Sequence, residues 1–241
     1  IPFDRNGIKF YRADGEISKH DEHTIMLSSV ELPSSKLTAE LPPLNNQATT
    51  LYKDRYVNFF GKDFLKGKTI AVYQHSSVAR DLLNDIFIAL GAKTILLGRS
   101  DAFIPIDTEA VRDEDIQQFK QWADEYRFDM LVSTDGDADR PLIADENGKF
   151  IRGDILGILT AKHLGADHIV TPVSSNTAVS SSNIFESVTL TKIGSPYVID
   201  GMSKKATDSP NSIVAGYEAN GGFLLGSDID HADCELSALP T

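Results

Sequence analysis

The part of the sequence with the clearest chemistry is an acidic segment that carries three aspartates at alternate positions. Asp135, Asp137 and Asp139 are separated only by Gly136 and Ala138, whose side chains are small enough to let the carboxylates converge. Three carboxylates held close together repel one another unless a divalent cation neutralises them. The spacing therefore predicts a metal site. Three protein oxygens leave coordination positions open for water and phosphate, which favours Mg²⁺.

The residues on either side of this segment say where it lies and what else it can bind. The apolar run at positions 130–133 predicts a buried strand that ends just before Asp135. In open α/β sheets, ligands bind beyond the carboxyl ends of the strands. Arg140 follows the third aspartate, and its guanidinium can bind two oxygens of a phosphate. The segment thus predicts a site in which a metal and an arginine neutralise a phosphate.

Other interpretations of the acidic segment stay open at this point. A solvated acidic turn without metal has the same spacing. An EF-hand loop would use the three aspartates and Glu146 at its twelfth position, but its sixth position requires glycine where this chain has Arg140. An EF-hand also needs flanking helices, whereas strands are predicted here. A phosphatase with an aspartate nucleophile also carries its acidic motif after a strand.

Short β-branched runs alternate with amphipathic segments along most of the chain. The patterns predict strands at 68–73, 93–97, 129–133, 140–144, 168–172, 188–191 and 213–217, and helices at 47–65, 78–90, 113–128, 154–164, 176–185 and 197–206. This alternation predicts an α/β fold of helices layered on sheets, with right-handed crossovers between parallel strands. Residues 222–225 could form a partner strand for 213–217.

The same patterns suggest how the chain is divided. Residues 1–46 are irregular, with a short strand possible at 9–11 and a proline-containing linker at 32–46. A boundary near Ile151, after the Asn147-Gly148 turn, separates residues 47–151 from residues 152–241. Because the chain does not begin with Met, we expect it to be a piece or a processed form of a longer protein.

Composition excludes several classes of protein. The 241 residues contain 23 Lys and Arg against 35 Asp and Glu, a net charge of −12, which argues against a nucleic-acid-binding surface. The single cysteine, Cys234, excludes an internal disulfide framework and a cysteine-rich zinc site, and fits a cytoplasmic protein. No apolar stretch approaches the roughly 18 residues that a membrane span requires, so we expect no membrane contact.

Four segments of the chain, in this order, resemble landmarks of the α-D-phosphohexomutase superfamily, specifically its phosphomannomutase/phosphoglucomutase branch. The segments are residues 6–11 with Asp14 and Gly15, residues 135–140, residues 191–197 and residues 216–222. The resemblance implies two consecutive mixed α/β layered domains of the phosphohexomutase type. In a four-domain parent enzyme, residues 1–46 would be the tail of domain 1 and a linker, 47–151 domain 2 and 152–241 domain 3.

The resemblance also implies an activity. Such an enzyme interconverts hexose 6-phosphate and hexose 1-phosphate through a phosphoserine and a bisphosphate intermediate, and mannose phosphate is the substrate we expect here. The serine loop would lie before Ile1 and the last domain after Thr241, so these 241 residues should be inactive alone, with the missing domains completing the site. The alternatives are a glucose or glucosamine phosphate mutase, a metal-dependent sugar-phosphate phosphatase, and a non-catalytic calcium- or sugar-binding module.

The family motifs assign a role to each candidate residue. Mg²⁺ would bind the three aspartates, Arg140 would hold phosphate oxygens, and Lys9 would act as the general base. Gly194 and Ser195 fall in a substrate loop, and Glu218 and Asn220 in the loop that binds sugar hydroxyls. Many family members have Ser and His where this chain has Asn220 and Gly222, which leaves the hexose specificity open.

Overall fold

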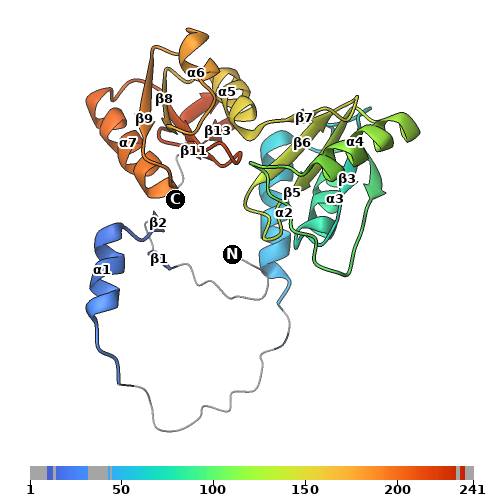
Figure 1. Cartoon of the computed structure of the whole chain (residues 1–241), viewed down its shortest axis with the longest axis horizontal. Coiled ribbons are helices and arrows are strands. Elements are labelled where there is room, and N and C mark those ends of the chain that lie inside the picture. Colours follow the sequence, from blue (N-terminus) through green and yellow to red (C-terminus); the bar gives the residue numbers. More distant parts are fainter. Residues whose placement is uncertain (1–9, 13–14, 32–42, 44, 232–233, 237–241) are drawn as a thin grey trace.

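A computed structural model describes residues 10–12, 15–31, 43, 45–231 and 234–236 of the chain. Most of the described elements belong to two lobes, each built around one sheet with helices on it (Figure 1). Within the described residues, no helix is both long and apolar enough to cross a membrane.

The first lobe contains a five-stranded sheet in the order β4-β3-β5-β6-β7. β3 runs parallel to β4 and β5, whereas β6 and β7 are antiparallel additions at the other edge. Its elements are α2 (Gln47–Phe60), β3 (Thr69–Tyr73), α3 (Arg80–Ala89), β4 (Lys93–Leu97), α4 (Asp113–Glu125), β5 (Met130–Thr134), β6 (Pro141–Asp145) and β7 (Phe150–Ile151).

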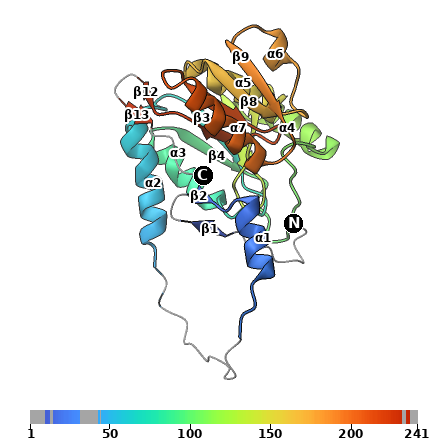
Figure 2. The same ribbon diagram turned by 90° about the vertical axis from the view of Figure 1, so that its left-hand side faces the viewer.

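Alternation along the buried strands explains why helices cover both faces of this sheet. Ala71 and Tyr73 face one way and join a core that contains Phe119 of α4. Ile70 and Val72 face the other way and pack with partly buried residues of α3. Successive side chains of a strand point to opposite faces, so a strand that is apolar throughout needs a cover on each side. α2 in turn packs against α3 (Figure 2).

The second lobe repeats this arrangement with a four-stranded sheet in the order β11-β10-β8-β9. β8 is parallel to β9 and β10, and β11 is antiparallel to β10. One core cluster joins the sheet to α5 and the other joins it to α7. The elements are α5 (Gly153–His163), β8 (His168–Pro172), α6 (Ala178–Ser181), β9 (Ser187–Thr191), α7 (Ser195–Asp208), β10 (Val214–Tyr217) and β11 (Phe223–Leu225).

The remaining described elements are short. They are β1 (Tyr11–Arg12), β2 (Gly15–Glu16), α1 (Lys19–Leu27), β12 (Ile229–His231) and β13 (Cys234–Leu236). β1 pairs with β2, and β12 with β13, each as an antiparallel ribbon. The linker predicted at 32–46 lies almost entirely outside the described residues.

The mixed α/β layers predicted from the sequence are confirmed, including the parallel pairing of β3 with β4. Two local predictions are wrong. The helix expected at 176–185 is a single turn, because a run of serines is followed by Asn183 in the left-handed region, at φ +54. The irregular first 46 residues contain α1, which begins at a capping box formed by Ser18 and Asp21.

Candidate functional site

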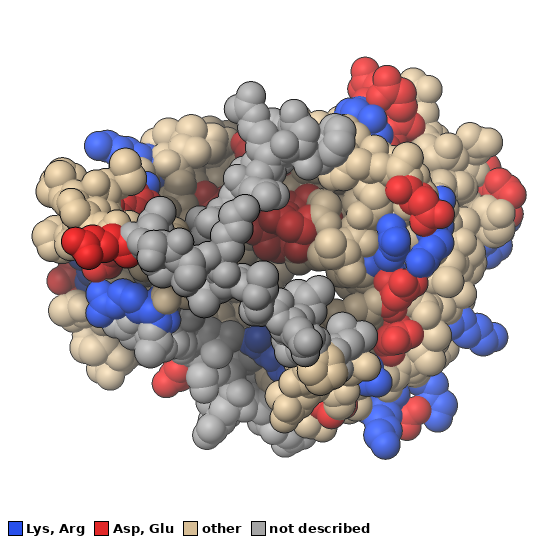
Figure 3. All heavy atoms as spheres, turned by 90° about the horizontal axis from the view of Figure 1, so that it is seen from below, with Lys and Arg blue, Asp and Glu red and all other residues tan. Residues whose placement is uncertain are grey.

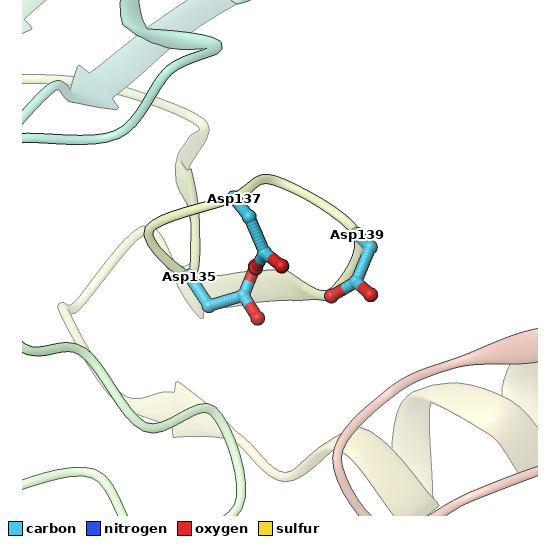
Figure 4. Close-up of side chains that lie close together, drawn as sticks. All are labelled: Asp135, Asp137 and Asp139. Carbon is cyan, nitrogen blue, oxygen red and sulfur yellow. The ribbon is translucent and has the colours of Figure 1, made fainter. Parts of the chain in front are cut away.

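The three aspartates predicted to bind a metal lie together in the loop between β5 and β6, which we call the aspartate loop (residues 135–140). One carboxylate oxygen from each of Asp135, Asp137 and Asp139 lies within 4.8 Å of the other two (Figure 4). Asp135 is buried, whereas the other two aspartates are exposed. The loop therefore presents three acidic oxygens to one point from a single short segment.

The loop holds this shape through its own main chain. The N–H of Asp135 donates to the carbonyl of Arg140 at 3.2 Å, and the N–H of Arg140 donates to Oδ1 of Asp135 at 3.3 Å. Between them, Ala138 adopts the left-handed conformation with φ +65, which brings the chain back toward β6. A non-glycine residue in this region is uncommon and costs conformational energy. The closed loop therefore fixes the main-chain positions from which the three carboxylates extend.

The clustered negative charges of the loop favour binding of a cation. Burial raises the pKa of Asp135 from 3.8 to about 6, and the negative charges of Asp139 and Asp137 add to this effect. Arg140 neutralises part of the charge, since its Nε lies 3.7 Å from Oδ1 of Asp139 and 4.0 Å from Oδ2 of Asp135. Clustered carboxylates that repel one another form the donor set of a hard divalent cation. The residues thus fit a metal ion.

The fold excludes the EF-hand interpretation. The aspartate loop is flanked by strands β5 and β6 instead of helices. Glu146, which would be the twelfth-position ligand, lies beyond β6 in the turn to β7, and the acidic cluster found among the described residues contains the three aspartates only.

The loop predicted to bind sugar hydroxyls is the turn between β10 and β11, which we call the 218–222 turn. Glu218 and Gly222 close it, because the N–H of Glu218 donates to the carbonyl of Gly222 at 2.9 Å. The N–H of Gly222 donates to Oδ1 of Asn220 at 2.9 Å. The side-chain oxygen of Asn220 is thus used within the turn, while the partly buried Glu218 keeps its carboxylate as a hydrogen-bond acceptor.

Contacts between the lobes place the 218–222 turn against the aspartate loop. A Cβ added to Gly221, which has φ +94, would lie 3.1 Å from Cγ of Pro141, the residue that follows Arg140. From the loop after β4, Oγ1 of Thr108 donates to the carbonyl of Asn220 at 2.7 Å. Within the second lobe, a Cβ on Gly153 of α5 would lie 2.6 Å from the carbonyl oxygen of Ala219, so α5 packs closely on the same turn. None of these contacts was predicted from the sequence, since each joins residues far apart in the chain.

The other predicted site residues are placed less closely. Gly194 caps the start of α7 with φ +125, a conformation that favours glycine, and its carbonyl accepts from Tyr197 and Val198. Ser195 is the first residue of that helix. These hydrogen bonds stay within the helix terminus and do not reach the aspartate loop. Lys9 lies outside the described residues.

Seen from below, acidic side chains gather in the hollow between the lobes (Figure 3).

Comparisons with known proteins find relatives along the whole chain. A sequence profile described as phosphoglucomutase/phosphomannomutase, alpha/beta/alpha domain III, matches residues 152–240. A phosphomannomutase of Salmonella muenchen is 50% identical over 100% of this chain and 50% of its own length. A phosphomannomutase of Sinorhizobium fredii is 43% identical over 100% of this chain and 52% of its own length. The chain therefore spans about half the length of these relatives.

A solved structure shows the same fold. A phosphoglucomutase/phosphomannomutase family protein from Burkholderia thailandensis superposes with a TM-score of 0.58 and 19% identity, over 74% of this chain and 39% of that one. The sequence matches extend over both lobes, and the landmark segments occur in the expected order. On these comparisons the chain is a relative of the phosphomannomutases, and its residues 152–240 match domain III of the phosphoglucomutase/phosphomannomutase type.

Proposed function

We propose that this chain supplies the metal site and the sugar-binding loop of a phosphohexomutase that interconverts mannose 6-phosphate and mannose 1-phosphate. The observation that carries the proposal is the contact between Gly221 and Pro141, which sets a hydroxyl-binding turn beside three clustered carboxylates. A phosphorylated sugar offers both hydroxyls and a phosphate, so it matches both loops at once. The identity to phosphomannomutases over the whole chain supports mannose as the hexose.

In this proposal, each group of the site has a defined task. Asp135, Asp137 and Asp139 hold Mg²⁺, which supplies charge neutralisation to a phosphoryl group when it is bound. The side chain of Arg140 lies beside the carboxylates, is 45% exposed, and holds further phosphoryl oxygens. Glu218 accepts hydrogen bonds from two neighbouring sugar hydroxyls.

The reaction itself also requires groups outside the described residues. The phosphoryl group passes from a serine oxygen to a sugar hydroxyl, so one P–O bond breaks as another forms. Lys9 takes the proton of the attacking hydroxyl, and the second phosphate of the bisphosphate then returns to the serine. We place this serine in the part of the longer protein that corresponds to the relatives' remaining length. Gly194 and Ser195, at the start of α7, contribute to substrate binding.

An activity assay of the full-length natural protein that contains these 241 residues tests this proposal. We expect isomerisation of mannose 1-phosphate to depend on Mg²⁺ and on a hexose 1,6-bisphosphate activator. Asp137→Asn should reduce kcat by about 100-fold or more, since the metal stabilises charge in the transition state. Asp124→Asn, an exposed acid on α4, is the matched control and should have no effect. Full magnesium-dependent activity in Asp137→Asn would show the metal assignment to be wrong.

The same assay decides the substrate and the main alternative. Glucose and glucosamine phosphates tested beside mannose phosphate would reveal a different hexose by a higher kcat/KM. Glu218→Gln should raise KM for any of these sugars without removing the metal requirement. A metal-dependent phosphatase remains the second candidate, because its acidic motif also follows a strand. Release of inorganic phosphate without isomerisation and without a bisphosphate activator would identify it.

Two further parts of the proposal concern organisation and location. We place the second domain of the enzyme at residues 47–151 and the third at residues 152–241, because the two sheets fall on either side of that boundary. We place the enzyme in the cytoplasm, in keeping with a single cysteine and a sugar-phosphate substrate. Limited proteolysis near residue 151 and fractionation of the source cells would test these two statements.

A further inference from the structure

The segment that joins β3 to α3 packs against the start of the aspartate loop. Two of its side chains are buried, His75 with an exposed fraction of 0% and Ser77 with 2%. Neither residue has a task in the proposed reaction. Both nevertheless hydrogen-bond to Thr134, the residue that precedes the metal-binding Asp135.

Three consecutive carbonyls at the start of the loop accept hydrogen bonds, two of them from this segment and the middle one from Thr134. Nε2 of His75 bonds to the carbonyl of Thr134 at 2.9 Å. The N–H of Val78 donates to the carbonyl of Gly136 at 3.0 Å. Between them, Oγ1 of Thr134 donates to the carbonyl of Asp135 at 2.8 Å. The main chain is thus fixed on both sides of the Asp135 side chain.

The hydroxyl of Ser77 donates to the hydroxyl of Thr134. A hydroxyl has one proton to donate, and that of Thr134 is used on the Asp135 carbonyl. Oγ of Ser77 lies 2.7 Å from Oγ1 of Thr134, so the Ser77 hydroxyl is the donor in this pair. Oγ of Ser77 in turn accepts from the N–H of Ala79 at 3.1 Å. The result is an ordered relay of donors from the start of α3 to the main chain of Asp135.

His75 bonds to β5 beyond the point where the main-chain pairing between β3 and β5 ends. The pairing of β3 with β5 ends at Val72 opposite Val132, two residues before Thr134. Beyond that point the hydroxyl of Ser133 donates to the carbonyl of Tyr73 at 2.7 Å, and the imidazole of His75 bonds to the Thr134 carbonyl. A carbonyl can only accept, so the proton of the neutral ring is on Nε2. Burial lowers the pKa of His75, which keeps the ring neutral.

This arrangement costs stability in two ways. The backbone of His75 has φ +28, outside the regions that residues with a side chain ordinarily adopt. Its Nδ1 is buried without a hydrogen-bond partner among the described residues. Unfavourable local geometry of this kind concentrates at functional sites, where the surrounding structure maintains it. The strained conformation of His75 is accompanied by its hydrogen bond to the Thr134 carbonyl.

We propose that His75 and Ser77 are positioning residues of the metal site: they fix the main chain at residues 134–136, so that Asp135 meets the cation in register with Asp137 and Asp139. The inference rests on the proposed function for the role of Asp135 as a ligand. The order that His75 and Ser77 impose on the metal-free loop does not depend on that function and can be measured separately.

Four variants of the full chain separate positioning from general stability. His75→Phe keeps a ring but removes the donor, and His75→Gln restores a donor near the position of Nε2. Ser77→Ala breaks the relay without altering a strained residue. His168→Phe is the matched control, because His168 is a buried histidine of the second lobe whose Nδ1 lies 2.9 Å from Oγ of Ser187.

Two measurements are made on each variant. Hydrogen exchange without metal reports on the amides of Asp135 and Arg140, which bond within the loop. Exchange of both amides should rise by roughly tenfold or more in His75→Phe and Ser77→Ala, because loss of a buried hydrogen bond changes an equilibrium constant by about that factor. Titration with Mn²⁺, followed by its electron paramagnetic resonance signal, should show affinity reduced by about 10- to 100-fold in the same two variants. His75→Gln should recover both properties, and His168→Phe should keep both.

The outcomes are distinct. Wild-type exchange rates at Asp135 and Arg140 in both His75→Phe and Ser77→Ala would overturn the positioning role, whatever the metal does. An equal rise in His168→Phe would also overturn it, since the effect would then be general destabilisation. Failure of the wild-type chain to bind Mn²⁺ would refute the metal site of the proposed function, while the exchange rates would still decide whether His75 and Ser77 order the loop. If His75→Phe does not fold, Ser77→Ala carries the test.

Discussion

Thr108 and Asn220 are joined by a 2.7 Å hydrogen bond although 112 positions separate them in the sequence. The hydroxyl of Thr108 donates to the main-chain carbonyl of Asn220, and both residues are buried, with exposed fractions of 1% and 8%. Thr108 belongs to the loop that follows β4 in the first lobe, whereas Asn220 is in the 218–222 turn of the second. This bond therefore attaches the 218–222 turn to the lobe that carries the aspartate loop.

Removing this bond should loosen the turn from the first lobe. Thr108→Val keeps the shape of the side chain but leaves the Asn220 carbonyl without its donor, which should lower the free energy of unfolding by about 1–3 kcal/mol. In the longer natural protein, KM for the hexose phosphate should rise more than kcat falls, since we propose that the turn binds the sugar and not the metal. Urea unfolding and steady-state kinetics measure the two effects.

Thr94→Val is the matched control for that variant. Oγ1 of Thr94 donates to Oδ1 of Asn84 at 2.8 Å, a bond that stays within the first lobe. We expect this variant to lose some stability and to keep the KM of the wild type. An unchanged KM in Thr108→Val would mean that the bond between the lobes has no influence on sugar binding.

The contrast between the two loops explains how much of the site could be predicted from the sequence. The aspartate loop was predictable because its chemistry is local: three acidic residues at alternate positions directly follow a buried strand, and β5 ends at Thr134, one residue after the end predicted from the sequence. The helix α1 was missed although Ser18 and Asp21 are spaced as a capping box. A search for that motif would have found it.

The contacts between the lobes could not be predicted in this way. Thr108 is one of many threonines in polar segments, and nothing in its neighbourhood indicates that it bonds to Asn220. Gly221 and Pro141 contact each other only after both sheets have formed. The need for glycine at Gly221 comes from its φ of +94 and from the proline beside it, neither of which is visible in a single sequence.

Mutation of the buried aspartate should have opposite effects with and without metal. Asp135→Asn removes a charge that burial and two neighbouring carboxylates disfavour, so without metal, in EDTA near pH 7.5, we expect the variant to be more stable than the wild type. With Mg²⁺ at about 100 times its Kd, the wild type should gain about 2.7 kcal/mol and the variant far less. Urea unfolding followed by the fluorescence of Trp122, which packs on the core of the first lobe, measures both.

The stability measurement on Asp135→Asn has one control and two results that would contradict the prediction. Asp124→Asn removes an exposed acid from α4 and should respond to Mg²⁺ as the wild type does. A metal-free wild type that is more stable than Asp135→Asn would mean that the three carboxylates do not strain the loop. Equal stabilisation of both proteins by Mg²⁺ would place the ion elsewhere.

Acid should destabilise the first lobe through His75. Burial lowers the pKa of His75 from 6.5; the Thr134 carbonyl and the charge of Asp115 act in the opposite direction, and Arg80 adds to the lowering. The unfolded chain therefore takes up this proton first, and the free energy of unfolding should fall as the pH drops below about 6.5. Asp135 titrates in the same range with the opposite sign, so the comparison must be made against a variant.

His75→Gln provides that comparison because its side chain does not titrate. The difference in unfolding free energy between the wild type and His75→Gln, measured in EDTA from about pH 7.5 to about pH 5, should shift in favour of the variant as the pH falls. Asp135 contributes equally to both proteins and cancels. A difference that stays constant over this range would mean that His75 has the same pKa in the folded and unfolded states.

The contact between α5 and the 218–222 turn leads to the last prediction. A Cβ on Gly153 would lie 2.6 Å from the carbonyl oxygen of Ala219, so Gly153→Ala must displace either the helix or the turn. Gly201→Ala produces a similar clash in α7, with its Cβ 2.7 Å from Cγ1 of Val170, but away from the turn. Each variant should lose about 1–3 kcal/mol of stability. Only Gly153→Ala should also raise KM for the hexose phosphate, because only that clash moves the main chain that precedes Asn220. Equal KM values in the two variants would show that sugar binding tolerates a displaced turn.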